Sequence, residues 1–299
     1  MDLNALGACL MTSACVVTQT TSGLIVGMLL FLVAAGLTLI FGVLKIVNFA
    51  HGTFYMLGGY VAYSTIGATD SYALAVLSGA LAMAVAGVLF ERVLISRVYG
   101  ANVLMQLLIC YAVVLIFDDL VKIVWGPEFH AMGMPPAFQV PPFIIAGGVV
   151  PPFYGVLVGI AALIAVLLSL GLSRTRFGKT VRAAAVNPQM VSALGVNTTV
   201  LFAVVFAIGG GLAGLAGALA APVRSLSPGM GFSILIESFI VTVIGGMGSI
   251  AGALVAALMI GMVRGFGTIG FPGFTDGLIY IVMIAVLVLR PQGLFGRRL

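Results

Sequence analysis

Residues 232–263 read FSILIESFIVTVIGGMGSIAGALVAALMIGMV, an apolar run of 32 residues in which Glu237 is the one charged side chain. A single helix of this length would extend about 48 Å, whereas the hydrocarbon core of a bilayer is about 30 Å thick. Three of the four residues 245–248 are glycine, and glycines weaken a helix at that point. The run therefore predicts two shorter helices, at 232–244 and 249–263, that fold into the membrane and back out.

The composition of the whole chain excludes a soluble protein. Of its 299 residues, 62% are apolar, and 13 Lys or Arg with 8 Asp or Glu make only 21 charged side chains. A soluble chain of this length would carry about 75, and a disordered chain needs low hydrophobicity and high charge. We therefore expect residues 1–299 to form a single domain, an all-α polytopic bundle of membrane helices.

Further apolar runs long enough to cross a bilayer lie along the rest of the chain. They cover residues 22–44, 49–68, 72–95, 103–125, 149–172, 198–221 and 275–290. Together with the run 232–263, counted as one segment or as two, the chain has eight or nine hydrophobic segments. The second of them follows Lys45 and Asn48 at once and is rich in glycine, which is typical of broken helices in transporters. We expect broken or re-entrant helices near 46–60 and 245–252; for the first, an ordinary span with small residues is the alternative.

The distribution of basic residues predicts the orientation of the chain, because cytoplasmic loops collect Lys and Arg. If the N-terminus is outside and the run 232–263 is one span, eight basic residues lie inside and five outside. If that run folds in and back, ten lie inside and three outside. The second topology is favoured, and it places the segment 173–197 and the C-terminus in the cytoplasm.

The segment 173–197 predicts a short helix that lies on the membrane surface. A helical run begins at Arg182, Asn187 is a good N-cap, and Pro188 suits the first position of a new helix. That helix is expected to stop at Gly195, with Asn197 capping the next span. Met190, Val191 and Leu194 would share one face. A surface helix with an apolar face can fit a groove on another protein.

Polar side chains inside a bilayer are costly and are therefore candidates for function. For His51, a packed ring bonded to a neighbouring carbonyl is favoured over a proton relay. Glu237 has two interpretations, lining a pathway or reaching out to the outer interface. Gly210 and Gly214, four residues apart, predict close helix packing. The polar residues within the apolar runs are Asn48, His51, Gln106, Asp118, Asp119 and Glu237.

Several classes of function are excluded by what the sequence lacks. His51 and His130 stand apart from any cysteine or acid at ligand spacing, and no nucleophile has a visible base. Residues 177–180 read FGKT but lack the glycine that a phosphate loop carries five residues earlier. The scattered basic residues do not indicate nucleic-acid binding. We therefore expect no enzyme activity, no metal and no cofactor in this chain. The cysteines, too few for a disulfide framework or metal site, are Cys9, Cys15 and Cys110.

Several motifs along residues 22–298 resemble one known family. They read IVNFAHGTFYMLGGY at 46–60, ERV at 91–93, RFG at 176–178, RAAA at 182–185, ALGVN at 193–197, GGMGSIAGA at 245–253 and RPQGLFG at 290–296. In this order they are similar to the permease subunits of branched-chain amino-acid ABC importers, of the LivH type.

This resemblance implies a machine of five parts in a bacterial inner membrane. A second permease subunit, expected to be a different but related chain, would complete the pathway. Two ATPase subunits would hold the ATP, and a periplasmic solute-binding protein would deliver the solute. The residues implied in receiving the ATPase stroke are Arg182, Ala183, Ala185, Asn187, Ala193, Gly195 and Asn197. The candidates for lining the pathway are Asn48, His51, Tyr55, Glu237, Gly245, Gly246 and Gly248.

The chain departs from the family pattern at two positions, and other functions compete. Related permeases usually carry an acidic residue where Asn187 stands, and several carry Lys where Glu237 stands. An ATP-independent secondary transporter or channel would need intramembrane charges for coupling, for which only Glu237 and His51 qualify. A membrane enzyme would need a nucleophile that the sequence does not reveal.

Overall fold

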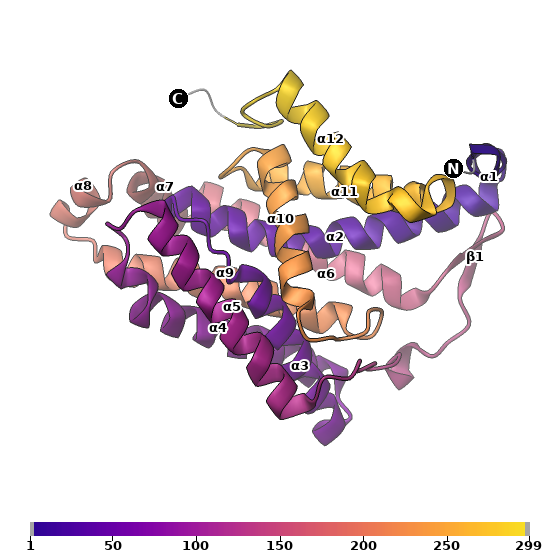
Figure 1. The fold of residues 1–299 in the computed structure, drawn as a ribbon, viewed down its shortest axis with the longest axis horizontal. Helices are drawn as coiled ribbons and strands as arrows, with labels where there is room; N and C mark the ends of the chain where they lie inside the picture. Colours follow the sequence, from indigo (N-terminus) through magenta and orange to yellow (C-terminus); the bar gives the residue numbers. More distant parts are fainter. Residues whose placement is uncertain (1–2, 297–299) are drawn as a thin grey trace.

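The computed structural model describes residues 3–296 as an assembly of helices with one short β-hairpin (Figure 1). Arg297 and Arg298, which entered the charge count, lie outside the described residues. Three 3₁₀ turns join the elements, η1 at Ile95–Arg97, η2 at Pro136–Phe138 and η3 at Pro272–Phe274. The α-helices are α1 Leu3–Leu10, α2 Ser13–Leu44, α3 His51–Thr69, α4 Tyr72–Val93, α5 Val103–Trp125, α6 Pro152–Arg174, α7 Arg176–Val186, α8 Pro188–Ala193, α9 Thr198–Ala220, α10 Met230–Gly245, α11 Ile250–Gly270 and α12 Thr275–Leu289.

Five of the described helices are long and apolar enough to cross a membrane, namely α2, α4 extended by η1, α6, α9 and α11. The helices α10 and α12 are apolar but shorter. The predicted spans at 49–68 and 103–125 correspond to α3 and α5, which are not among the five. The all-α membrane bundle is thus supported, while the count of eight or nine segments stays a prediction.

The helices α2 and α9 form the buried centre of the bundle, and α6 lies at its edge. The close packing predicted for Gly210 and Gly214 is confirmed, because a Cβ added to either would lie within 2.6 Å of α4 atoms. Near the same face of α9, a Cβ on Gly217 would lie 1.9 Å from the carbonyl oxygen of Tyr55 in α3. Backbones therefore touch where these helices cross, as is common in membrane bundles.

The helix α2 begins nine residues before the predicted start at residue 22. The polar residues of this extra part are satisfied within the helix. The hydroxyls of Thr18 and Thr21 donate to the carbonyls of Ala14 and Val17, at 2.9 and 2.8 Å. Hydroxyls bonded to the preceding turn do not interrupt a helix.

The apolar run 232–263 is divided into two helices, as predicted. The helix α10 ends at Gly245 and α11 begins at Ile250, with Gly246 and Gly248 at φ angles of 96° and 93°. Only glycine adopts such angles readily. The second piece is longer than predicted, because α11 continues past Arg264 to Gly270. How the two pieces lie relative to a bilayer remains a prediction.

The interruption expected near 46–60 lies at the start of that range. The chain is non-helical from Lys45 to Ala50, Lys45 has a left-handed φ of 59°, and α3 then runs unbroken from His51 to Thr69. The four glycines of α3 do not break it. Some of them allow a close contact with another helix instead. A Cβ on Gly58, for example, would lie 2.4 Å from the Cα of Gly214 in α9.

The N-terminal end of the bundle holds two features that the sequence reasoning missed. Cys9 of α1 and Cys15 of α2 form one disulfide, which the sequence analysis, having excluded only a disulfide framework, did not foresee. Strands β1 (Phe143–Ile145) and β2 (Gly148–Val150) form an antiparallel hairpin, so the fold is not purely helical. Its turn, Ala146–Gly147, has positive φ at both residues, as tight hairpins require. Figure 1 places α1 and β1 at one end of the molecule and α7 and α8 at the other.

The disulfide gives a test of orientation. Structural disulfides persist in oxidising compartments, so Cys9 and Cys15 should be oxidised in cells if the N-terminal end lies outside the cytoplasm. After blocking with N-ethylmaleimide under denaturing conditions, both should react with a maleimide-polyethylene glycol only once a reductant is added. The Cys9→Ser variant serves as control, because its Cys15 should be blocked at the first step. Complete blocking of the unsubstituted protein without reductant would contradict the predicted orientation.

Candidate functional site

The segment 45–50 and the first turn of α3 place the predicted polar candidates inside the protein. Asn48 and His51 are 0% exposed, and Tyr55 is buried one turn later. The side-chain oxygen of Asn48 accepts from the backbone N–H of Ala50 at 3.1 Å. This bond holds the turn that leads into α3. Within the single chain, these three side chains support the segment rather than face an open channel.

His51 packs against α2. Its Nε2 lies 3.0 Å from the carbonyl oxygen of Val33, and a Cβ on Gly36 would lie 3.0 Å from its ring. The ring therefore fits only because residue 36 is glycine. The interpretation as a packed histidine bonded to a carbonyl agrees with this geometry.

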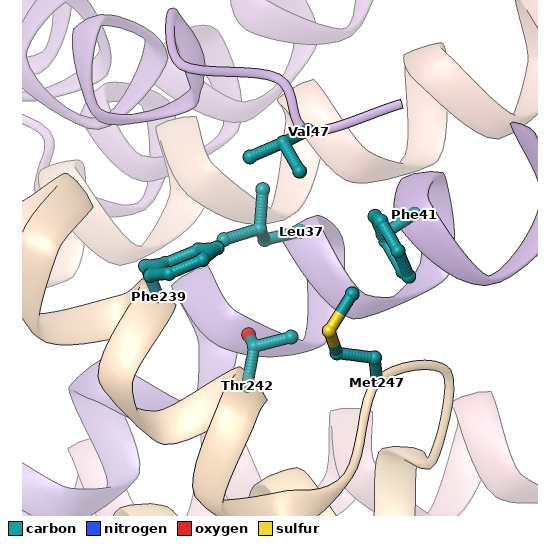
Figure 2. A pocket seen from close by; sticks show the side chains of 6 residues that line it. All are labelled: Leu37, Phe41, Val47, Phe239, Thr242 and Met247. Atoms are coloured by element: carbon teal, nitrogen blue, oxygen red, sulfur yellow. The ribbon is translucent and has the colours of Figure 1, made fainter. Parts of the chain in front are cut away.

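The two interrupted segments meet at an apolar hollow, shown in Figure 2. Val47 comes from the segment 45–50, and Met247 comes from the break between α10 and α11. The helices α2 and α10 supply the remaining walls, and the hydroxyl of Thr38 bonds that of Thr242 at 3.2 Å across them. The residues labelled in Figure 2 are Leu37, Phe41, Val47, Phe239, Thr242 and Met247.

The C-terminal segment closes the end of α10. The N–H groups of Leu294 and Phe295 donate to the carbonyls of Ile244 and Gly245, at 2.8 and 3.1 Å. These carbonyls would otherwise be unsatisfied at a helix end. A Cβ on Gly246 would lie 2.5 Å from the backbone of Gly296. The motif at 290–296 thus has a structural role, which is to cap the break.

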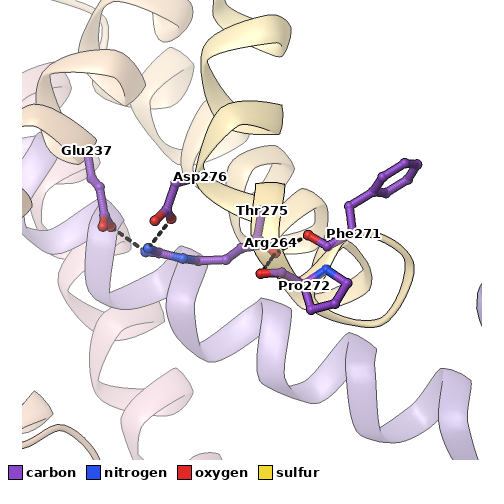
Figure 3. A network of polar contacts seen from close by, with 6 residues as sticks. All are labelled: Glu237, Arg264, Phe271, Pro272, Thr275 and Asp276. Carbon is purple, nitrogen blue, oxygen red and sulfur yellow. Dashed lines mark hydrogen bonds and ion pairs between the residues drawn. The ribbon is translucent and has the colours of Figure 1, made fainter. Parts of the chain in front are cut away.

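Glu237 has partners that the sequence reasoning did not foresee (Figure 3). The two terminal nitrogens of Arg264 in α11 bind the carboxylates of Glu237 in α10 and Asp276 in α12, at 2.7 and 2.8 Å. Glu237 and Arg264 are largely enclosed, with side chains 15% and 21% exposed, whereas Asp276 is 78% exposed. This pairing explains why α11 continues through Arg264.

The segment 173–197 forms two short helices at the far end of the bundle. The Asn187 side chain accepts from the N–H of Met190 at 3.0 Å, and the Asn197 side chain accepts from Val200 at 3.1 Å, so both predicted caps are present. The turn between α8 and α9 has Gly195 at a φ of 87°. The first helix, α7, begins at Arg176 rather than at Arg182. Thr175 caps it by accepting from the N–H of Gly178 at 3.1 Å.

The apolar residues of α8 do not share one free face, contrary to expectation. Val191 is buried against the bundle, whereas Met190 and Leu194 are 60% and 77% exposed. The exposed pair is available to another protein. Of the residues implied in ATPase coupling, Ala185 is half-buried and the exposed ones are Arg182, Ala183, Asn187, Ala193, Gly195 and Asn197.

A buried acid at the end of α4 was also missed. Glu91 is 0% exposed, and the hydroxyl of Tyr99 donates a hydrogen bond to it. Burial, together with this bond to Glu91, raises the pKa of Tyr99 well above its usual range. The signal in the sequence was an acid in the last turn of a span with a tyrosine eight residues later. Within residues 3–296, no three His, Cys, Asp or Glu side chains could jointly hold a metal ion.

Comparisons with known proteins identify relatives along most of the chain. The family model described as "Branched-chain amino acid transport system / permease component" matches residues 19–287. The high-affinity branched-chain amino acid transport system permease protein BraD of Pseudomonas aeruginosa is 31% identical over 295 residues, 93% of this chain and 95% of that protein. The corresponding LivH of Escherichia coli K12 is 28% identical over the same shares. The fructose import permease protein FrcC of Rhizobium meliloti is 35% identical over 147 residues, 44% of this chain and 40% of that protein. No solved structure matches.

The ion pair of Glu237 should stabilise the packing of α10 on α11. Replacing Glu237 by Gln leaves a largely enclosed guanidinium with one partner fewer, which costs about 1–3 kcal/mol. The matched control Asp276→Asn removes a carboxylate that is mostly exposed and should cost about 0–1 kcal/mol. Thermal unfolding of the purified protein in one detergent compares them. An equal loss in both variants would mean that enclosure of the Glu237 pair contributes nothing.

Proposed function

The chain belongs to the family of branched-chain amino acid transport system permease components, and from this premise we propose that it forms one half of the membrane pathway of an ATP-driven importer. The solute would be a branched-chain or similar small amino acid, delivered by a periplasmic binding protein. A related but different permease would form the other half. Two ATPase subunits would dock at the end that carries α7 and α8, and that end and the C-terminus would face the cytoplasm of the bacterial inner membrane.

The observation that carries the proposal is the element formed by α7 and α8. It is held by caps at Thr175, Asn187 and Asn197, yet it presents Met190 and Leu194 to the surroundings. A bundle has no structural need for an exposed apolar pair beyond the ends of its spans. A groove on another protein would bury them.

The pathway is proposed to follow the seam between α3 and α10, towards the partner permease. Glu237 of α10 would lie along it, and the Gly245–Gly248 break lies next to the apolar hollow. Backbone freed from helical bonding at such a break can bind the polar ends of an amino acid. Asn48 and His51, buried in the single chain, would fix the shape of this seam.

An ATP-independent transporter is the competing function, and the charges do not favour it. Such a protein needs intramembrane charges that are free to titrate or bind ions. Glu237 is already paired with Arg264, and His51 is bonded to a carbonyl. The second function would also leave the exposed face of α8 without a role.

Purification from the native membrane in a mild detergent tests the proposal. We expect an ATPase and a second permease to co-elute, and the reconstituted complex to take up leucine only with ATP and the binding protein. A panel of other amino acids, amides and sugars identifies the preferred solute. In the same assay Glu237→Gln, corrected for folded protein, should change rate or selectivity. Elution of the chain alone, under conditions that keep a control ABC complex intact, would contradict the proposal, as would uptake without ATP.

The docking role of α8 is tested by adding charge to its exposed face. Leu194→Glu should reduce ATP-driven uptake by about tenfold, equivalent to about 1.4 kcal/mol of lost docking free energy, because a carboxylate would be buried in an apolar contact. Leu194 is 77% exposed, so the bundle itself should be unaffected. The matched control is Gln189→Glu, which adds the same charge to another exposed position of α8. Normal uptake by Leu194→Glu would place the docking contact elsewhere.

A further inference from the structure

An apolar groove lies on the flank of the bundle, at the end that carries α7. Five of its residues come from α6, and its other walls include Leu39 of α2 and Phe177 of α7. The residues from α6 are Ile164, Leu167, Leu168, Gly171 and Leu172. All the side chains that line it are apolar. We call this the α6 groove.

The stripe that lines the α6 groove ends in positive charge. Residues 164, 167, 168 and 171 recur at the spacing of one helical face, and the next step of three residues is Arg174, the last residue of α6. Arg176 follows at the start of α7. Both side chains are exposed. An apolar trough therefore runs towards two guanidinium groups.

Among residues 3–296, these charges have no acidic partner. The chain has no Asp or Glu between Glu128 and Glu237. None of the ion pairs found among residues 3–296 involves Arg174, Arg176 or Lys179. By contrast, Arg264 inside the bundle has two carboxylate partners. The cluster beside the α6 groove is thus left to be neutralised by something outside this chain.

The groove opens towards the surroundings of α6, the most peripheral of the five long apolar helices. Leu163 and Val166, beside the lining stripe, are 58% and 54% exposed. Around a membrane-spanning helix these surroundings are lipid acyl chains unless another protein covers them. Basic pockets between helices at the cytoplasmic side are suited to anionic lipid headgroups.

We propose that the α6 groove is a binding site for an anionic phospholipid, with an acyl chain in the trough and the phosphate against Arg174 and Arg176. An amphiphile of this kind matches both halves of the site, apolar along α6 and anionic at its end. A free anion would leave the trough empty, and a neutral lipid would leave the guanidinium groups unpaired.

The site would connect the lipid to α7. Phe177, the second residue of α7, forms part of the groove wall, and Arg182 of α7 donates a hydrogen bond to the carbonyl of Leu172 in α6. A lipid in the trough therefore packs between α6 and the helix that leads into α8. The description of α7 as a coupling element rests on the proposed function. The lipid-binding proposal itself does not, because lipid binding can be measured whatever the chain transports.

The test uses the full complex as purified, or the chain itself if it elutes alone, with two probes of the same acyl chains. These are dioleoyl phosphatidylglycerol, which is anionic, and dioleoyl phosphatidylcholine, which is zwitterionic. Thermal unfolding in detergent is followed as each lipid is titrated. We expect the anionic lipid to raise the unfolding temperature at concentrations where the zwitterionic lipid does not. Equal shifts with both would overturn the proposal.

Two pairs of variants separate the site from general charge and bulk. Arg174→Gln with Arg176→Gln should weaken the response to phosphatidylglycerol by about tenfold or more, given the contribution of basic residues at an anionic headgroup. Arg97→Gln with Arg290→Gln removes the same charge from exposed positions predicted on the same membrane side. This control should respond as the unsubstituted protein does; an equal loss in the control would overturn the site.

The second pair fills the trough. A Cβ added at Gly171 or at Gly159 of α6 meets nothing within 4 Å, so a side chain can begin at either position without a backbone clash. Of these two glycines, only Gly171 lines the α6 groove. Gly171→Leu should abolish the selective response and reduce the phosphatidylglycerol that co-purifies, measured by mass spectrometry, while Gly159→Leu should change neither. An unchanged response in Gly171→Leu would overturn the proposal. The proposal would also be overturned if a protein that co-purifies with the unsubstituted chain and with Gly159→Leu were lost from Gly171→Leu. That result would show that a protein fills the groove.

Discussion

The arrangement of this bundle depends on backbones that touch at glycines. Helices in lipid gain no hydrophobic free energy by associating, so close packing has to hold them together. At the crossing of α2 and α9, a Cβ on Gly36 would lie 2.7 Å from the carbonyl oxygen of Gly209. Where α3 meets α10, a Cβ on Gly52 would lie 1.9 Å from the carbonyl oxygen of Gly231. These approaches set how the two interrupted segments lie, and so they determine that Val47 and Met247 line one hollow.

Periodicity and glycine content predicted most of the helices, because both act locally. The division of 232–263 at 245–249, the caps at Asn187 and Asn197 and the packing of Gly210 all follow from neighbouring residues. The misses depend on contacts between distant residues. Arg264 looked like a helix boundary until Glu237 and Asp276 provided its partners. The Cys9–Cys15 disulfide and the buried Glu91 likewise depend on which side chains the fold brings together. For His51, by contrast, the interpretation favoured from the sequence, a packed ring bonded to a carbonyl, agrees with its position beside Val33.

The helix α2 lines both the apolar hollow inside the protein and the α6 groove beside α7. Leu37 and Phe41, one turn apart, face the apolar hollow, whereas Leu39 lies on the opposite side of the helix and meets Phe177 in the α6 groove. A displacement of α7 would therefore press on α2 directly behind the hollow. The wall opposite α2 is the end of α10, which the backbone N–H groups of Leu294 and Phe295 hold in place.

The charges of the chain divide into two groups, and the division indicates where this protein needs other molecules. Arg264, enclosed between three helices, is satisfied within the chain, because leaving it unpaired in a medium of low polarity would be costly. An exposed end of the bundle carries Arg174, Arg176 and Lys179. Water solvates an unpaired charge there, so the charge costs little free energy in the absence of an external anion or a partner. The exposed Met190 and Leu194 lie in α8 and just beyond its end, at the same end of the bundle as this cluster. Unsatisfied charge and unsatisfied apolar surface thus coincide at one end of the bundle, which is the combination expected where a membrane subunit meets both lipid headgroups and a soluble partner.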